Sequence, residues 1–110
     1  MDKKLKILFV SSEVAPFAKT GGLADVAGSL PQAIKEMGHD IRVVMPEYSV
    51  IPDEYLKQLK HILHFRVKVG EREDYVGINK LVNNEVPTYF VDNKNYFHRD
   101  SLYQNSDKAI

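Results

Sequence analysis

A glycine-bearing loop between two apolar runs, with a helical pattern behind it, most strongly constrains the fold. The first run, residues 6–11, is nearly continuous rather than alternating, which is typical of a parallel strand covered on both faces. The second run spans residues 41–45. A strand, a glycine loop, a helix and a strand within 40 residues predict a right-handed βαβ unit with two parallel strands.

The segment between the two runs has the pattern of an amphipathic helix. Its apolar residues recur at spacings of three and four, which predicts one apolar stripe. Thr20 or Gly21 is a suitable N-cap, and Gly38 stands where a helix C-terminus favours left-handed geometry. The stripe consists of Leu23, Val26, Ala27, Leu30, Ala33, Ile34 and Met37.

Beyond this unit the pattern changes. Residues 65–69 and 75–78 alternate apolar and polar side chains on either side of a polar turn, which predicts a hairpin of two half-buried strands. Residues 86–91 resemble another core strand, and residues 52–62 a loop or short helix. No terminating element is evident after residue 92. We therefore predict an α/β fold, a parallel sheet with an inserted β-hairpin.

Composition limits the classes of function. The chain of 110 residues suits one compact domain. Its 15 basic residues balance 15 acidic ones, so no strong field points to nucleic acid or a membrane. The absence of cysteine excludes a disulfide framework and fits a reducing compartment. The apolar run near the amino terminus is too short for a signal peptide or membrane span. We expect a cytoplasmic protein that binds neither nucleic acid nor membranes.

The loop before the helix is the candidate ligand site. Backbone N–H groups at a helix start are unpaired, and the helix dipole adds partial positive charge there. Gly21 and Gly22 have no Cβ, so a diphosphate can approach closely, and either glycine can take dihedrals closed to other residues. Lys19 adds a mobile ammonium. The pattern is neither the dinucleotide nor the P-loop fingerprint. From these residues alone, an anion cradle and a tight turn with a solvated lysine both remain open.

Two carboxylates flank this loop. Glu13 stands at the end of the first strand, where ligands bind in open α/β sheets. It could hydrogen-bond sugar hydroxyls or orient Lys19, and the alternative is a loop carboxylate that pairs with a nearby base. Asp25 falls in the first helical turn, and its interaction with the helix dipole explains it without a catalytic role.

The histidines and Tyr96 are weaker candidates. Aromatic faces and hydroxyls suit carbohydrate, so Tyr96 could contact a sugar, or it could be a core tyrosine. The histidines lack the spacing of metal ligands, so we predict no metal site. They are His39, His61, His64 and His98.

Residues 7–26, which include Lys19-Thr20-Gly21-Gly22-Leu23, resemble the N-terminal signature of bacterial glycogen synthases and plant starch synthases. The resemblance is weakest over residues 50–85. It continues in shorter segments at residues 38–48, 89–93, 96–97 and 102–103.

The resemblance implies a partial Rossmann-like N-terminal domain of a retaining GT-B glycosyltransferase. Such enzymes move glucose from ADP-glucose to the non-reducing end of an α-1,4-glucan such as glycogen, without a metal ion or other cofactor. Lys19 matches the family lysine that contacts the donor, and Thr20, Gly21 and Gly22 carry over as the donor loop. No catalytic residue is certain, and Glu13 is the only candidate.

The resemblance also implies that residues 1–110 are the first part of the N-terminal domain, without its remainder and without the C-terminal domain. About three parallel strands leave sheet edges and a helix-free face uncovered, so we expect self-association and no activity of the chain by itself. A stand-alone nucleotide-binding module and a non-catalytic structural fragment remain alternatives. The choice between ADP-glucose and UDP-glucose remains open.

Overall fold

The computed structural model describes residues 3–81 and 84–97. The strands described there form one sheet with the order β1-β2-β5-β4-β3. Along the chain the elements are β1 (Lys6–Val10), α1 (Gly22–Glu36), β2 (Asp40–Pro46), α2 (Asp53–Leu56), β3 (Leu59–Val69), β4 (Arg72–Leu81), β5 (Thr88–Asp92) and α3 (Lys94–Phe97).

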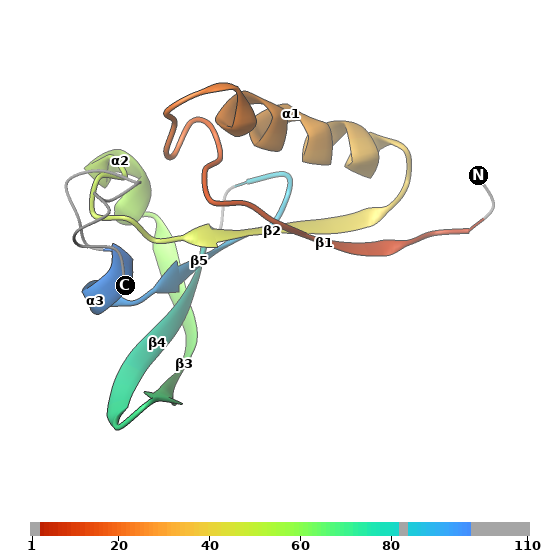
Figure 1. Cartoon of the computed structure of the whole chain (residues 1–110). Coiled ribbons are helices and arrows are strands. Elements are labelled where there is room, and N and C mark those ends of the chain that lie inside the picture. Colours follow the sequence, from red (N-terminus) through yellow and green to blue (C-terminus); the bar gives the residue numbers. More distant parts are fainter. Residues whose placement is uncertain (1–2, 82–83, 98–110) are drawn as a thin grey trace.

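The first half of the chain forms the predicted parallel unit. β1 pairs with β2 in parallel, with Ile7 opposite Ile41, and β2 pairs in parallel with β5. Helix α1 connects β1 to β2 and lies over one face of the sheet (Figure 1). The α/β prediction is confirmed in this half.

The second half widens the sheet with antiparallel strands. β3 and β4 form a hairpin, and β4 pairs antiparallel with β5. The turn contains Gly70 at a φ of 64°, a conformation that residues with a Cβ rarely adopt. The predicted hairpin is confirmed, and both strands are longer than the predicted residues 65–69 and 75–78. The expectation of two half-buried strands holds for β4 only, because the residues of β3 after Leu59 are all exposed. Strand β5 begins at Thr88, slightly later than predicted.

The core lies between α1 and the sheet. Ile41, Val43 and Met45 alternate along β2 toward this side, and all three are buried. Phe90 of β5 is completely buried, and the ring of Phe17 meets it edge-on at a centroid distance of 5.3 Å, a geometry that aromatic pairs favour. Because Phe17 belongs to the loop after β1, this contact fastens that loop to the sheet.

Helix α1 packs through a face that differs from the predicted stripe. Its buried residues are Ala24, Ala27 and Pro31. Of the predicted stripe, Ala27 and Ile34 contact the core, but the other residues are exposed, which corrects the prediction. The exposed residues are Leu23, Val26, Leu30, Ala33 and Met37. Small and large apolar residues recur here with similar spacing, so periodicity alone could not tell which set meets the sheet.

Strand β1 is covered on one face only, which corrects the expectation of two covered faces. Ile7 and Phe9 pack against the core. Leu8 and Val10 point to the opposite face and are 65% and 71% exposed. The reason is that α1 covers one face of the sheet (Figure 1) and that Ile7 and Phe9 pack against the core to which α1 contributes Ala27. The expected helix-free face is therefore present at β1.

The ends of α1 agree with the predicted caps. Gly21 is the N-cap, and Gly38 has a φ of 99° after the last turn. The next residue, His39, is buried, and its Nδ1 accepts a hydrogen bond from the N–H of Leu5 at 3.0 Å. His39 thereby connects the end of α1 to the start of β1. Over residues 3–81 and 84–97, no helix has the length and apolar character needed to cross a bilayer.

Candidate functional site

The carboxyl ends of β1, β2 and β5 meet at one edge of the sheet because the three strands are parallel. Glu13, Glu47 and Asn93 follow these three ends. The N–H of Glu47 donates to the carbonyl oxygen of Val91 at 2.8 Å, so the ends remain in register beyond the strands. Ligands of open α/β sheets bind at this edge, and the loop of residues 11–21 begins there.

Glu13 is the side chain that organises this loop, and it is only 2% exposed. Its Oε1 accepts hydrogen bonds from the backbone N–H groups of Thr20 at 3.0 Å and Gly21 at 3.2 Å, and its Oε2 accepts one from the Thr20 hydroxyl at 2.7 Å. A buried carboxylate is stable only with such partners. Its charge also lies near the start of α1, where the helix dipole favours an anion. Glu13 therefore sets the position of Thr20 and Gly21.

This role of Glu13 was not among the predicted alternatives. Because the N–H groups of Thr20 and Gly21 donate inward to Glu13, they are not the donors that would face a ligand. The next N–H groups, those of Gly22 and Leu23, have no acceptor within the helix and belong to exposed residues, whereas Ala24 is completely buried. The predicted anion site is therefore limited to the backbone N–H groups in the first turn of α1.

The two glycines are open to solvent but are not in left-handed conformations. Gly21 has extended backbone, with φ −167° and ψ −157°, and Gly22 is helical. Neither glycine therefore uses the dihedrals closed to other residues that it could take. A Cβ built on either glycine meets nothing within 4 Å. What the glycines provide is space above the backbone, as the close approach of a diphosphate would require.

Lys19 is held at the start of α1 by an exposed ion pair. Its Nζ lies 2.9 Å from Oδ1 of Asp25, and the two side chains are 54% and 59% exposed. Such pairs contribute about 0.2–1 kcal/mol, so an incoming anion can replace Asp25 at little cost. The sequence interpretation assigns Asp25 only an interaction with the helix dipole. In the structure it also keeps the ammonium near the open glycines.

The backbone of the loop lies in close contact with α1 at Gly28. A Cβ on Gly28 would lie 2.7 Å from the backbone oxygen of Ala15, and the N–H of Ala15 donates to the carbonyl oxygen of Ala24 at 3.0 Å. The peptide bond between Ala15 and Pro16 is cis. Backbone contacts thus determine the path of the loop, and the packing requires glycine at position 28.

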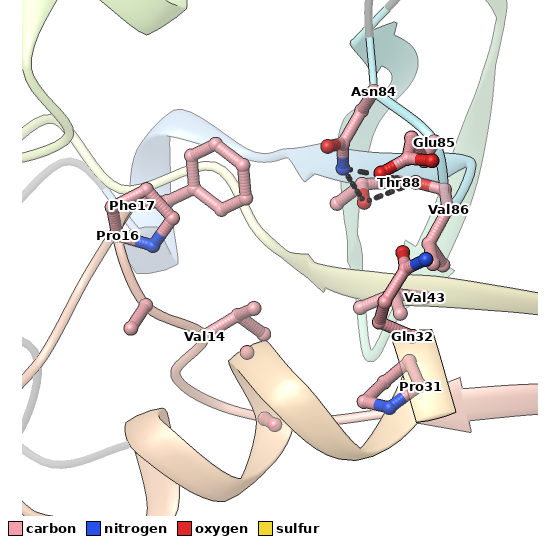
Figure 2. A pocket seen from close by; sticks show the side chains of 13 residues that line it. Val14, Pro16, Phe17, Pro31, Gln32, Val43, Asn84, Glu85, Val86 and Thr88 are labelled. Carbon is pink, nitrogen blue, oxygen red and sulfur yellow. Dashed lines mark hydrogen bonds between the residues drawn. The ribbon is translucent and has the colours of Figure 1, made fainter. Parts of the chain in front are cut away.

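A small cavity beside this contact does not fit a nucleotide sugar. It has a volume of about 130 Å³ and lies between the loop, α1 and the segment before β5 (Figure 2). At one end Nδ2 of Asn84 donates to the carbonyl oxygen of Val86 and to the hydroxyl of Thr88, both at 2.9 Å. Small-molecule sites typically have volumes of ~300–1,000 Å³. The open surface above the glycines is the better candidate.

Tyr96 lies against the hairpin rather than beside the glycine loop. Its hydroxyl accepts a hydrogen bond from Nη2 of Arg72, whose guanidinium carbon lies 5.5 Å from the centre of the Tyr96 ring. Its backbone N–H donates to Oδ1 of Asn93 at 3.1 Å. These contacts do not bring Tyr96 together with Lys19 and Gly21. Its contact with a sugar or the donor stays a prediction.

The structure also assembles a polar row that the sequence did not reveal. Oε1 of Glu47 accepts a hydrogen bond from Nδ2 of Asn79 at 2.6 Å, and Oδ1 of Asn79 lies 2.9 Å from Nδ1 of His61. His61 in turn contacts His64. No sequence signal links these residues, because Glu47 follows β2, Asn79 lies on β4 and both histidines lie on β3. Their meeting depends on the hairpin register.

Comparison with known sequences gives a consistent set of relatives. A family model described as the starch synthase catalytic domain matches residues 6–110. The glycogen synthase of Caldicellulosiruptor saccharolyticus is 54% identical over 99 residues, which are 90% of this chain and 21% of that protein. The glycogen synthase of Bacillus subtilis is 48% identical over 103 residues, which are 94% of this chain and 21% of that protein.

Among solved structures, the catalytic domain of starch synthase IV from Arabidopsis thaliana has the same fold. It matches with a TM-score of 0.83 and 23% sequence identity, over 96% of this chain and 22% of that one. The chain thus spans about one fifth of the length of the curated relatives it matches.

Proposed function

The chain belongs to the starch synthase catalytic domain family, and on this basis we propose that it is the first part of the N-terminal domain of a glycogen synthase. The parent enzyme would be a cytoplasmic, retaining GT-B glucosyltransferase. It would transfer glucose from ADP-glucose to the non-reducing end of an α-1,4-glucan. The glycogen synthase relatives support this assignment. For the donor, the support is that the starch synthase IV domain was solved bound to ADP and acarbose.

The loop that Glu13 holds is the main support for a donor site in this segment. The buried carboxylate fixes Thr20 and Gly21 from below, while the surface above Gly21 and Gly22 is open. The N–H groups at the start of α1 and the helix dipole favour an anion at that surface. We assign the diphosphate of the nucleotide sugar to it, with Thr20 as an anchor of the loop rather than a direct ligand.

Lys19 supplies the charge that the reaction requires. When the bond between the anomeric carbon and the β-phosphate oxygen breaks, negative charge grows on the departing nucleotide diphosphate. An ammonium that leaves Asp25 for this phosphate stabilises the charge more in the transition state, where it has begun to develop, than in the ground state. In this role Lys19 and the backbone N–H groups act without a metal ion or other cofactor.

The segment provides one side of such a site. Base recognition, further cationic contacts and acceptor binding would come from parts of the parent enzyme that this chain does not contain. We therefore expect the chain alone to bind ADP weakly and to transfer no glucose. Transfer of labelled glucose from ADP-glucose to glycogen by the isolated chain would contradict this division of the site.

A chimeric enzyme tests the assignment directly. In the glycogen synthase of Bacillus subtilis, this chain replaces the segment that it matches over 103 residues. The chimera should transfer glucose from ADP-glucose to glycogen. Lys19→Ala in the chimera should lower kcat/KM on the order of 100-fold, as expected when one group that stabilises the developing charge is lost.

The matched control is Lys68→Ala, which removes an exposed lysine from the hairpin. This variant should retain the kcat/KM of the unmodified chimera. If Lys19→Ala is as active as Lys68→Ala, Lys19 does not act on the donor. A chimera that transfers glucose only from UDP-glucose would overturn the choice of donor.

A further inference from the structure

His61 and His64 share one face of β3 because of a bulge. Residues three apart in a regular strand point to opposite faces. Here the register shifts between His61, opposite Asn79, and Leu63, opposite Ile78. Residue 62 is therefore the extra residue of a β-bulge. Such bulges change the direction in which the neighbouring side chains point. His64 lies opposite Gly77, so both histidines point to the same face.

The two rings face one another through nitrogen atoms. Nε2 of His61 lies 3.0 Å from Nδ1 of His64, and the rings are nearly parallel, at an interplanar angle of 28°. The far side of His64 stacks on the ring of Tyr75 at a centroid distance of 5.7 Å. The pair is therefore held in place on its outer side by an aromatic ring.

The partners of His61 determine its tautomer. Nδ2 of Asn79 donates to Glu47, so its Oδ1 faces Nδ1 of His61 and accepts a hydrogen bond from it. In the neutral ring, Nε2 of His61 then carries a lone pair directed at His64. Carboxylate and amide groups behind a histidine orient ligating histidines in metal sites in the same way.

We propose that His61 and His64 form a two-histidine site for a divalent transition-metal ion such as Zn²⁺, which revises the prediction of no metal site that was based on their spacing in the sequence. Imidazole nitrogen suits Zn²⁺, Ni²⁺ and Cu²⁺. With Zn–N bonds of about 2.0–2.1 Å and tetrahedral geometry, two ligating nitrogens are roughly 3.3–3.4 Å apart. In the observed arrangement the two nitrogens point at each other at 3.0 Å, so both rings must turn about their side-chain torsions until their lone pairs converge on the ion. For the ion to bind, the proton of His64 moves from Nδ1 to Nε2. Nδ1 of His64 and Nε2 of His61 then both present lone pairs. Because this is only a change of tautomer, the neutral pair releases no proton.

The site would be a chelate completed by water. No cluster of three or more His, Cys, Asp or Glu with metal-binding geometry occurs within residues 3–81 and 84–97, and both histidines are exposed. Arg66 follows His64 on the same face and lowers the affinity for a cation. We therefore assign the ion no part in glucose transfer. It would cross-link the two sides of the bulge in β3.

Zn²⁺ titration of the complete 110-residue chain tests this inference, with isothermal calorimetry for stoichiometry and ¹⁵N NMR of the imidazole rings for location. We expect one Zn²⁺ per chain, with shifts at His61 and His64. His61→Ala and His64→Ala should each lower the affinity at least 10-fold, because each removes one of two ligands. Circular dichroism shows whether the variants remain folded.

His98→Ala is the matched control, since it removes a histidine outside the pair and should leave the affinity unchanged. Absence of Zn²⁺ binding to the unmodified chain would overturn the inference, and so would equal affinity in folded His61→Ala and His64→Ala variants. A shift at His39 or His98 in place of the pair would also overturn it. None of these results bears on the donor loop, so the proposed function is tested separately.

Discussion

Glu13 and Thr20 are joined twice, because the buried carboxylate of Glu13 accepts hydrogen bonds from both the backbone N–H and the hydroxyl of Thr20, at 3.0 and 2.7 Å. The backbone N–H of Gly21 donates a third hydrogen bond to the same carboxylate at 3.2 Å. These hydrogen bonds therefore hold the glycine loop in its conformation in the absence of a ligand. Such preorganisation lowers the entropy that binding must otherwise overcome.

Removing the Glu13 carboxylate should destabilise the fold measurably. Glu13→Ala removes the buried acceptor of the Thr20 and Gly21 donors, which belong to exposed residues, and a hydrogen bond to a charged group contributes about 1.5–3 kcal/mol. We expect the free energy of unfolding to fall by roughly 2–4 kcal/mol in urea titrations. Glu13→Gln should lose less, because its amide oxygen still accepts the N–H bonds and its NH₂ group can donate to the hydroxyl of Thr20.

Glu36→Ala serves as the comparison, since Glu36 is an exposed helix residue. Surface changes of this kind usually stay within about 0.5 kcal/mol. A Glu13→Ala variant as stable as Glu36→Ala would mean that Glu13 does not hold the loop.

Alanine at Gly28 and alanine at Gly22 should differ in stability. At Gly28 the new Cβ would lie 2.7 Å from the backbone oxygen of Ala15, and overpacking of this kind costs ~1–3 kcal/mol. At Gly22 the Cβ meets nothing, and alanine favours the helix. Thermal unfolding should show a lower Tm for Gly28→Ala and an equal or higher Tm for Gly22→Ala. The opposite order would disprove the packing of the loop on α1.

The ion pair of Lys19 and Asp25 should be weak. A double-mutant cycle with Lys19→Ala and Asp25→Ala should give a coupling energy of about 0.2–1 kcal/mol, and added salt should reduce it. Both expectations follow from the exposure of the two side chains. A coupling above roughly 2 kcal/mol would mean that a phosphate cannot readily replace Asp25.

The isolated chain should self-associate through the uncovered face of β1. Leu8 and Val10 are exposed there, and β1 is an edge strand of the described sheet, a combination that favours pairing with another chain. Sedimentation velocity should show association that increases with concentration. Leu8→Lys and Val10→Lys should shift the chain toward monomer, whereas Met37→Lys, on the exposed side of α1, should not. A wild-type chain that is monomeric at all concentrations would contradict this prediction.

The elements whose signals are local could be predicted from the sequence. The apolar runs gave β1 and β2, Gly38 marked the end of α1, and alternation around Gly70 gave the hairpin. The buried face of α1 could not be predicted, because Ala24 and Leu23 both belong to sets with helical spacing. Only the position of the helix on the sheet decides between them.

The glycine loop was predictable as a site, but its internal geometry was not. Lys19, Gly21 and Gly22 are adjacent in sequence, so their proximity needs no tertiary information. The bonds from Thr20 and Gly21 to Glu13 span seven and eight residues and depend on how the loop folds back. The meeting of His61 and His64 depends on one bulged residue, for which the sequence carries no marker.

An NMR titration of the isolated ¹⁵N-labelled chain with ADP tests most directly whether the first turn of α1 receives the diphosphate. We predict weak, saturable binding, with the largest amide shifts at Gly22 and Leu23. Lys19→Ala should weaken the binding, and Lys68→Ala should not. No shift at millimolar ADP, or shifts centred on the hairpin rather than on the start of α1, would contradict the account.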